Sequence, residues 1–218
     1  MKNKKFQMSE SIFLAIFLAI GGGFRDAYSY NLRGHVFANA QTGNLALFSQ
    51  ALANLQFHTA FKFVFPIVAF IIGIYLTDLI KFFFKNNNKI HWRQIIVLIE
   101  VLMLIIVGYI PTEFNHLANT IISLACAMQV ETFRKFLNFP MATTMCTGNL
   151  RSGTEALVEF SLHKDSNKLK KSLYYFLIIA MFCTGVALGA ISGNFLGLQS
   201  IWLDSIIMFF IFLLMFKK

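Results

Sequence analysis

Eight apolar stretches follow one another along the chain, with short polar or basic segments between them. Stretches of this length and apolar content are typical of helices that cross or enter a membrane. They occupy residues 11–30, 36–54, 61–84, 94–110, 116–131, 140–160, 172–195 and 200–216. We therefore predict an all-α, polytopic membrane protein in which residues 1–218 form a single integral membrane domain.

The composition leads to the same class. Hydrophobic residues make up 57% of the 218 positions, 26 of them Phe, which is well above the usage of soluble globular domains. The formal net charge is +9, but the Lys and Arg residues lie in short clusters between the apolar stretches. This distribution is typical of membrane topology signals and not of a nucleic-acid surface, so the predicted partner is the lipid bilayer.

A short motif occurs twice. Thr42-Gly43-Asn44 returns as Thr147-Gly148-Asn149, at an offset of 105 residues, and the alignment runs without a gap from residues 21–54 to residues 126–159. The chain is therefore predicted to contain two repeats, residues 11–110 and 116–216. The alternative is a chance similarity between two apolar segments.

The repeat also bears on the amino terminus, where lysines precede the apolar residues 11–20 as in a secretory signal peptide. The apolar stretch continues to Tyr30, and residues 12–20 correspond at the same offset to the internal residues 117–125. We therefore interpret this stretch as the first transmembrane helix.

Charge decides which stretches cross the membrane. If all eight cross, the basic residues 81–93 and 134–135 fall on the side opposite the amino terminus, against the positive-inside rule. If the two Thr-Gly-Asn segments do not cross, both termini and 15 of the 19 Lys and Arg residues are cytoplasmic; the others are Arg25, Arg33, Lys62 and Arg151. We predict six transmembrane helices plus two short interrupted or re-entrant helices.

Three crossings per repeat would make the two repeats an inverted pair. In many secondary transporters with this arrangement, interrupted segments at corresponding positions mark a binding site near the midplane. Glycine permits a break in the helix, and Thr and Asn supply capping groups. Two helix amino termini facing each other would favour an anion or a carboxylate, although the same residues could serve helix packing alone. The predicted solute-binding residues are Thr42, Gly43, Asn44, Thr147, Gly148, Asn149, Asp26 and Arg151.

Two acidic residues inside the apolar stretches are candidates for ion coupling. Asp26 and Glu100 would be expensive to bury as isolated charges, so each should be paired, neutral or next to a polar cavity. Arg25 and Asp26 point about 100° apart on a helix and need not be partners. Asp26 could instead lie at the membrane boundary. Arg151 could instead form a pair with Glu155, four residues further on.

The sequence does not indicate metal binding, catalysis or a cofactor. The three cysteines, Cys126, Cys146 and Cys183, lie in apolar stretches without metal-ligand spacing, so no metal site is predicted. The motifs of zinc proteases, P-loops, dinucleotide sites and serine hydrolases are not found in the sequence. We predict no catalytic residue and no cofactor, and we do not expect an enzyme.

Several of these residues resemble those of a known family. The segments Gly23-Phe-Arg-Asp26-Ala-Tyr-Ser-Tyr30, Gly34-His-Val-Phe37-Ala-Asn39 and Ala127-Met-Gln129, together with Thr143-Thr144 and both Thr-Gly-Asn motifs, resemble the YoaK family. These are small bacterial membrane proteins that carry a domain of unknown function. The resemblance implies a polytopic helical protein of the bacterial inner membrane and no particular activity. Arg25 departs from the pattern, because an apolar residue usually precedes the Asp.

Two functional hypotheses follow. The first is a small secondary transporter or permease for a small polar or anionic solute. The alternative is a non-transporting membrane scaffold or assembly factor. A homo-oligomer is compatible with both.

Overall fold

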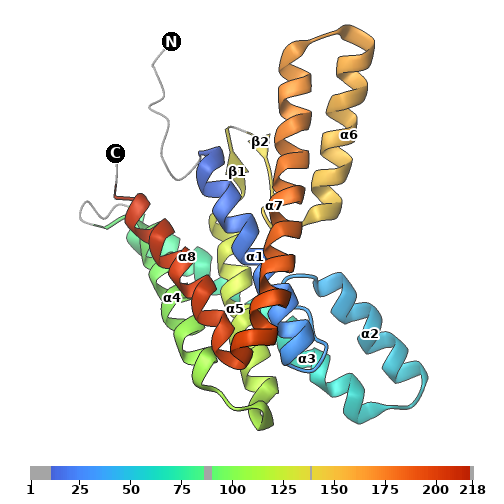
Figure 1. The fold of residues 1–218 in the computed structure, drawn as a ribbon, viewed down its shortest axis with the longest axis vertical. Helices are drawn as coiled ribbons and strands as arrows, with labels where there is room; N and C mark the ends of the chain where they lie inside the picture. The colour runs from blue at the N-terminus through green and yellow to red at the C-terminus, as the bar shows by residue number, and fades with distance from the viewer. Residues whose placement is uncertain (1–10, 86–89, 138, 217–218) are drawn as a thin grey trace.

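The computed structural model describes residues 11–85, 90–137 and 139–216, which form a bundle of α-helices (Figure 1). Each of the eight apolar stretches contains a helix, although residues 36–40 and 141–145 are not helical. The all-α class is thus confirmed. The helices are α1 (Ile12–Leu32), α2 (Gln41–Ala53), α3 (Phe57–Phe84), α4 (Trp92–Tyr109), α5 (Asn115–Thr132), α6 (Cys146–His163), α7 (Ser166–Leu196) and α8 (Ile201–Leu214). The short elements are the 3-10 helices η2 (Thr112–Phe114) and η3 (Gly197–Ser200) and the strands β1 (Lys135–Phe136) and β2 (Phe139–Pro140).

Some boundaries differ from the predicted ones. α7 begins at Ser166, six residues before the apolar stretch, because the Asp165 side chain accepts a hydrogen bond from the Asn167 amide and so caps the helix. The antiparallel hairpin β1–β2 was not predicted, since two residues per strand leave no alternation of apolar and polar positions. The amino-terminal lysines, Lys89 and the last two lysines, which support the predicted topology, lie outside the described residues.

Four helical segments are long and apolar enough to cross a membrane. They are α1, α3, α4 and the segment Ser166–Leu214. This last segment contains both α7 and α8, and Figure 1 shows that these two helices run in opposite directions on either side of η3. Gly197, at the end of α7, has a φ of 55°, which glycine adopts readily.

The helices contact one another in pairs. α1 packs against α7, α3 against α5, and α4 against α8, while α2 lies on α3 and α6 lies on α7. Glycines bring two of these pairs into backbone contact: a Cβ at Gly185 of α7 would lie 2.0 Å from the Ile20 carbonyl oxygen of α1, and a Cβ at Gly73 of α3 would lie 2.7 Å from that of Leu124 in α5. Small residues at helix crossings serve this close approach in membrane bundles.

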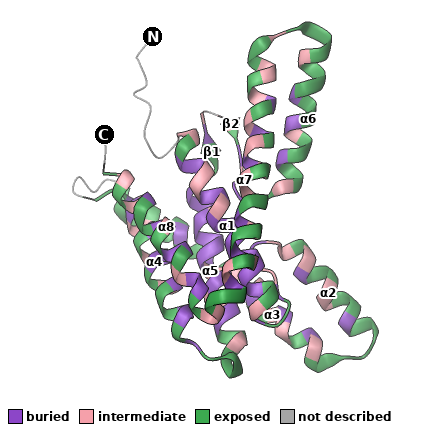
Figure 2. Ribbon diagram, viewed as in Figure 1, coloured by how far each residue is buried: buried purple, intermediate pink, exposed green. Residues whose placement is uncertain are grey.

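α1 and α5 form the buried centre, whereas α2 and α6 lie at the periphery (Figure 2). The buried residues of α2 are Asn44 and Ala51, and those of α6 are Asn149, Gly153 and Ala156. Both helices begin in the middle of the molecule, and Figure 1 shows them running from there toward opposite ends. The two Thr-Gly-Asn motifs therefore lie in the first turns of two short helices that begin near the middle of the molecule.

Candidate functional site

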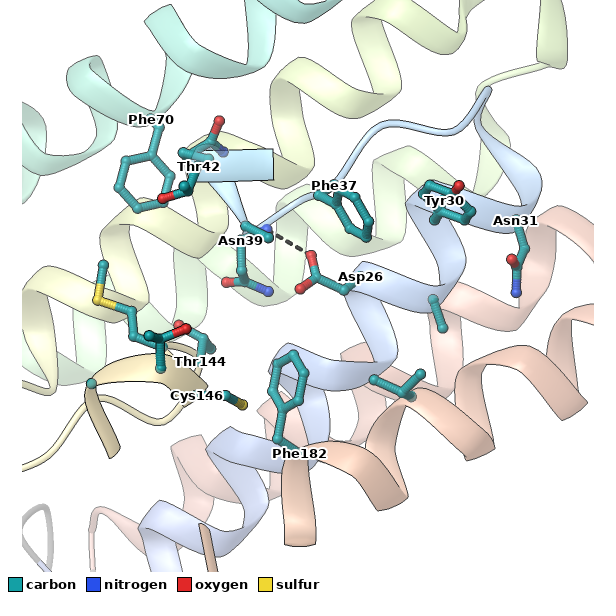
Figure 3. Close-up of a pocket in the computed structure, with 17 residues that line it drawn as sticks. Asp26, Tyr30, Asn31, Phe37, Asn39, Thr42, Phe70, Thr144, Cys146 and Phe182 are labelled. Carbon is teal, nitrogen blue, oxygen red and sulfur yellow. Dashed lines mark hydrogen bonds between the residues drawn. The ribbon is translucent and has the colours of Figure 1, made fainter. Parts of the chain in front are cut away.

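A cavity of about 660 Å³ lies where α2 and α6 begin (Figure 3). This is within the usual range for small-molecule sites. Gln41 and Thr42 line it from the first turn of α2, and Cys146, Thr147 and Gly148 from the first turn of α6. α1, α3 and α7 close the remaining sides through Asp26, Phe70 and Phe182, among others. Four of the predicted solute-binding residues, Asp26, Thr42, Thr147 and Gly148, thus meet at one cavity.

The asparagine of each motif holds the segment that precedes its helix. Residues 36–40 and 141–145 are non-helical and largely buried, so their peptide groups need partners. Asn44 accepts a hydrogen bond from the Phe37 amide at 3.0 Å and donates one to the Phe37 carbonyl at 2.8 Å. Asn149 donates to the Ala142 carbonyl at 2.6 Å, which also reaches seven residues back. Both side chains serve the backbone, and neither residue lines the cavity.

Asp26 connects α1 to the segment before α2. Its carboxylate accepts a hydrogen bond of 2.7 Å from the Asn39 amide, drawn as the dashed line in Figure 3. The Asn39 side chain donates in turn to the Gly22 carbonyl at 2.9 Å. Asp26 is 7% exposed, so it is a buried carboxylate at the cavity wall and not a boundary residue in water.

Two buried polar atoms at the cavity wall have no hydrogen-bond partner among the described residues. They are Oδ1 of Asn39 and Oγ1 of Thr144, in residues that are 6% and 7% exposed. Asn39 and Thr144 are 105 residues apart, the same offset that separates the two Thr-Gly-Asn motifs. Burying a polar atom without a hydrogen-bond partner destabilises the folded protein, so these two atoms favour a ligand or water in the cavity. The sequence pattern contained this signal, because both residues lie in the aligned segment, but they were not predicted as site residues.

The rest of the wall is largely apolar. Phe37 and Phe182 lie on either side of Asp26 in Figure 3, and Phe70 faces the cavity from α3. Among the described residues no Lys or Arg side chain lines the cavity. A charged solute would therefore depend on backbone N–H groups, hydroxyls and Asp26 for its polar contacts.

The helix ends add positive potential. Neither α2 nor α6 has a side-chain hydrogen bond at its N-cap residue, Ala40 or Met145, in the part of the chain described. The first N–H groups of a helix lack partners within the helix and carry the positive end of its dipole. Because Asp26 bonds the segment before α2, the amino terminus of α6 is the less compensated of the two ends.

Besides Asn44 and Asn149, two more predicted site residues, Gly43 and Arg151, lie away from the cavity wall. A Cβ at Gly43 would lie 3.1 Å from the Phe37 ring, so this glycine lets the ring pack closely on α2. The side chain of Arg151 is 81% exposed and forms an ion pair of 2.8 Å with Glu155. The alternative interpretation of Arg151 as half of an intrahelical pair is therefore confirmed.

Glu100 belongs to a separate buried cluster. Nε of Arg25 lies 2.6 Å from Oδ2 of Asp204, and Nη1 of Arg25 lies 3.3 Å from Oε2 of Glu100. All three side chains are fully buried. Arg25 thus points to α4 and α8 while Asp26 points to the cavity, as the angle between neighbouring helical positions predicted. Asp204 was missed, although it is the one acidic residue in the apolar stretch 200–216.

A second buried arginine, Arg33, has a structural role. It donates hydrogen bonds of 2.8 Å to the carbonyls of Val107 and Ile110, at the end of α4, and also contacts the Tyr28 hydroxyl. A guanidinium at a helix carboxyl terminus satisfies free carbonyls and meets the negative end of the dipole.

One titratable group lies just before a candidate span, at the start of α4. Nδ1 of His91 accepts a hydrogen bond of 3.2 Å from the Arg93 amide, and the Gln94 side chain accepts one of 2.8 Å from the His91 amide. Partial burial, and secondly the nearby Arg93 guanidinium, lower the pKa of His91. Neutral His91 can therefore act as the cap of α4 at neutral pH.

Comparison with known proteins agrees with this architecture. The family model described as "Protein of unknown function (DUF1275)" matches residues 14–214. The chain is 22% identical over 204 residues to the UPF0700 transmembrane protein YoaK of Bacillus subtilis (strain 168), which covers 88% of each chain. No solved structure matches. The resemblance to the YoaK family is thus confirmed, and the chain belongs to the DUF1275 family of membrane proteins, whose function is unknown.

Proposed function

We propose that this protein is a small secondary transporter or permease that binds a small polar or anionic solute in the cavity between α2 and α6. One observation carries the proposal. The amino termini of two short helices, one from each repeat, open onto the same cavity, whose wall holds the partnerless polar atoms of Asn39 and Thr144.

The helix contacts support the proposed inverted repeat of residues 11–110 and 116–216. α1 packs on α7 as α5 packs on α3, α2 lies on α3 as α6 lies on α7, and α1 contacts α8 as α5 contacts α4. Exchanging the repeats therefore returns these three kinds of contact, whereas α3 contacts α4 directly and α7 and α8 each contact η3. The six crossing helices would be α1, α3, α4, α5, α7 and α8, with α2 and α6 as the re-entrant pair.

The residues that line the cavity from α3 and α7 also correspond to each other. Phe70 lies three residues before Gly73 in α3, and Phe182 lies three residues before Gly185 in α7. Each glycine contacts the backbone of the first helix of the other repeat, and each Phe lines the cavity. Both repeats thus contribute a Phe ring from the third helix and one helix amino terminus, which is the arrangement of a midplane site in transporters with inverted repeats.

We place the protein in the bacterial inner membrane with both termini in the cytoplasm. The start of α1, the end of α8 and the turn between α6 and α7 lie toward the same end of the molecule in Figure 1. Lys164, Lys168, Lys170 and Lys171 lie at or near that turn. The positive-inside rule favours a cytoplasmic position for this end.

The residues that line the cavity indicate what kind of solute it could bind and which residue could couple transport to an ion. The helix amino termini and the hydroxyls of Thr42 and Thr147 suit a carboxylate or another small anion, and the Phe rings suit an apolar part of the same molecule. Asp26 is the proposed coupling residue at the cavity, because a buried carboxylate beside a bound solute can change its charge with binding. Glu100 could act only indirectly, since it lies in the Arg25 cluster.

A native cysteine tests whether the cavity is open to water. Cys146 lines it, while Cys126 is fully buried. Two variants would each keep one of these cysteines, with the other one and Cys183 changed to Ala. In vesicles of both orientations, we expect membrane-impermeant thiosulfonate reagents to modify Cys146, the anionic reagent faster than the cationic one, and to leave Cys126 unmodified.

If folded protein resists both reagents at Cys146 from both sides, water does not reach the cavity and the transporter proposal fails. The non-transporting scaffold then becomes the better interpretation. If Cys146 reacts, saturable solute uptake by purified protein in liposomes is the next requirement.

A further inference from the structure

The Arg25 cluster joins three helices with an imbalance of charge. Arg25 of α1 contacts Glu100 of α4 and Asp204 of α8, so one guanidinium faces two carboxyl groups. With all three groups ionised the cluster would carry one uncompensated negative charge, and all three side chains are fully buried. An unpaired buried charge costs much more free energy than a neutral acid, so burial favours the uptake of one proton.

No second cation faces the cluster among the described residues. Cys126 of α5 is a thiol, with Sγ 4.0 Å from Nη1 of Arg25. Asp26, the next residue on α1, is itself acidic and bonds the Asn39 amide. Arg33 lies two turns further along α1, where its guanidinium bonds the carbonyls at the end of α4. The part of α7 that follows Ser172 contains no charged residue.

The contacts distinguish the two acids. Asp204 makes the shorter contact with Arg25, and its second oxygen, Oδ1, faces Gly21, where an added Cβ would lie only 2.6 Å away. Asp204 is thus held between α1 and the guanidinium. Glu100 makes the longer contact, 3.3 Å. Oε1 of Glu100 and Oδ1 of Asp204 are both buried without a hydrogen-bond partner among the described residues, so it is the distance to Arg25 that separates the two acids.

We propose that Arg25, Glu100 and Asp204 form a proton-binding site inside the membrane domain, in which Arg25 and Asp204 are the ion pair and Glu100 holds the proton. The site contains one proton per chain at neutral pH. This inference concerns the charge of the cluster and does not depend on transport. Should the chain transport a solute, the charge of this cluster would affect the electrostatic potential at the cavity, because Arg25 and Asp26 are neighbours on α1.

Infrared spectroscopy of the purified protein in lipid nanodiscs tests the proposal. The carbonyl stretch of a protonated carboxylic acid is separate from the carboxylate bands. We expect wild-type protein at neutral pH to show this band, and Glu100→Gln to lose it while keeping its helical signal. Asp204→Asn should lose it as well, because Glu100 then ionises as the single partner of Arg25. Asp78→Asn, at an acid whose side chain is 58% exposed, is the matched control and should change nothing.

Three results would overturn the proposal. The first is the absence of the band in wild-type protein, and the second is a band that survives Glu100→Gln. The third is a band that appears only when sodium is replaced by choline, which would make the cluster a metal-cation site. Glu100→Gln replaces a neutral acid by a neutral amide of the same shape, so it should fold even if Asp204→Asn does not. These results are also distinct from those of Cys146 modification, which report on the cavity alone.

Discussion

At the scale of single residues, one asparagine and one threonine side chain present unsatisfied polar atoms at the cavity wall. Asn39 and Thr144 each present a buried oxygen without a partner, whereas Asn44 and Asn149 use their side chains to hold the backbone. Residue type alone did not separate these two roles. The Thr-Gly-Asn motifs predicted the position of the site, and the residues just before them supply its unsatisfied atoms.

Thr144→Val tests this distinction. The substitution removes a hydroxyl that has no partner, so we expect a melting temperature equal to or above that of the wild type, together with weaker solute binding. The control is Ser172→Ala, which removes a buried hydroxyl bonded at 2.8 Å to the Gly153 carbonyl. This control should lower stability by about 0.6–1 kcal/mol. A marked loss of stability in Thr144→Val would mean that its hydroxyl has a structural partner after all.

At the scale of elements, the bundle depends on close contact between α1 and α7. Gly185→Ala would place a Cβ 2.0 Å from the Ile20 carbonyl oxygen, and a backbone atom cannot move aside without separating the helices. We expect a large loss of stability, of about 2 kcal/mol or more, measured by thermal unfolding in detergent. Gly193→Ala on the same helix meets only the Leu32 side chain at 3.2 Å and should be close to neutral. Equal effects of the two changes would contradict this packing.

The start of α4 should depend on pH through His91. Its pKa is lowered in the folded protein, so the unfolded chain binds more protons as the pH falls below the ordinary value of about 6.5. The contribution of this cap is complete above that value and is lost as the pH falls through the folded pKa. His91→Ala should cost about 1 kcal/mol at neutral pH, which is about 2–4 °C in melting temperature.

His91→Asn separates the cap from its titration. Asparagine is a good N-cap residue and does not titrate. We expect this variant to keep the stability of the wild type at neutral pH and to lose less of it when the pH is lowered. If wild type and His91→Asn lose stability in parallel, His91 is not the group responsible.

At the scale of the whole molecule, the proposal depends on α2 and α6 entering the membrane from opposite sides without crossing it. Single cysteines in a cysteine-free protein test this by accessibility in intact cells and inverted vesicles. We expect cysteines at Asn54, Asn115 and Gln199 to be labelled from outside, and a cysteine at Asn167 from the cytoplasm, because three spans per repeat place these turns on alternate sides. Labelling of a cysteine at Asn54 from the cytoplasm would mean that α2 crosses the membrane, and it would contradict the inverted repeat.

The sequence by itself determined the class of the protein, its helical segments and the two positions at which short helices begin. These features are local: apolar length predicts a membrane helix, and each Thr-Gly-Asn motif lies in the first turn of a short helix. The predicted capping role of the motif was wrong, because the N-cap residues are Ala40 and Met145 and neither makes a side-chain hydrogen bond in the part of the chain described. It also indicated that Arg25 and Asp26 need not be partners, because the geometry of one helix decides that.

Only the tertiary structure decided which of these residues meet. Asp204 lies 179 residues from Arg25 along the chain, and its partner depends on how α8 packs against α1 and α4. The same holds for the cavity, whose walls come from α1, α2, α3, α6 and α7. A residue's type and spacing predict the face of its own helix, but the neighbour on that face depends on contacts between distant segments, which no local pattern contains.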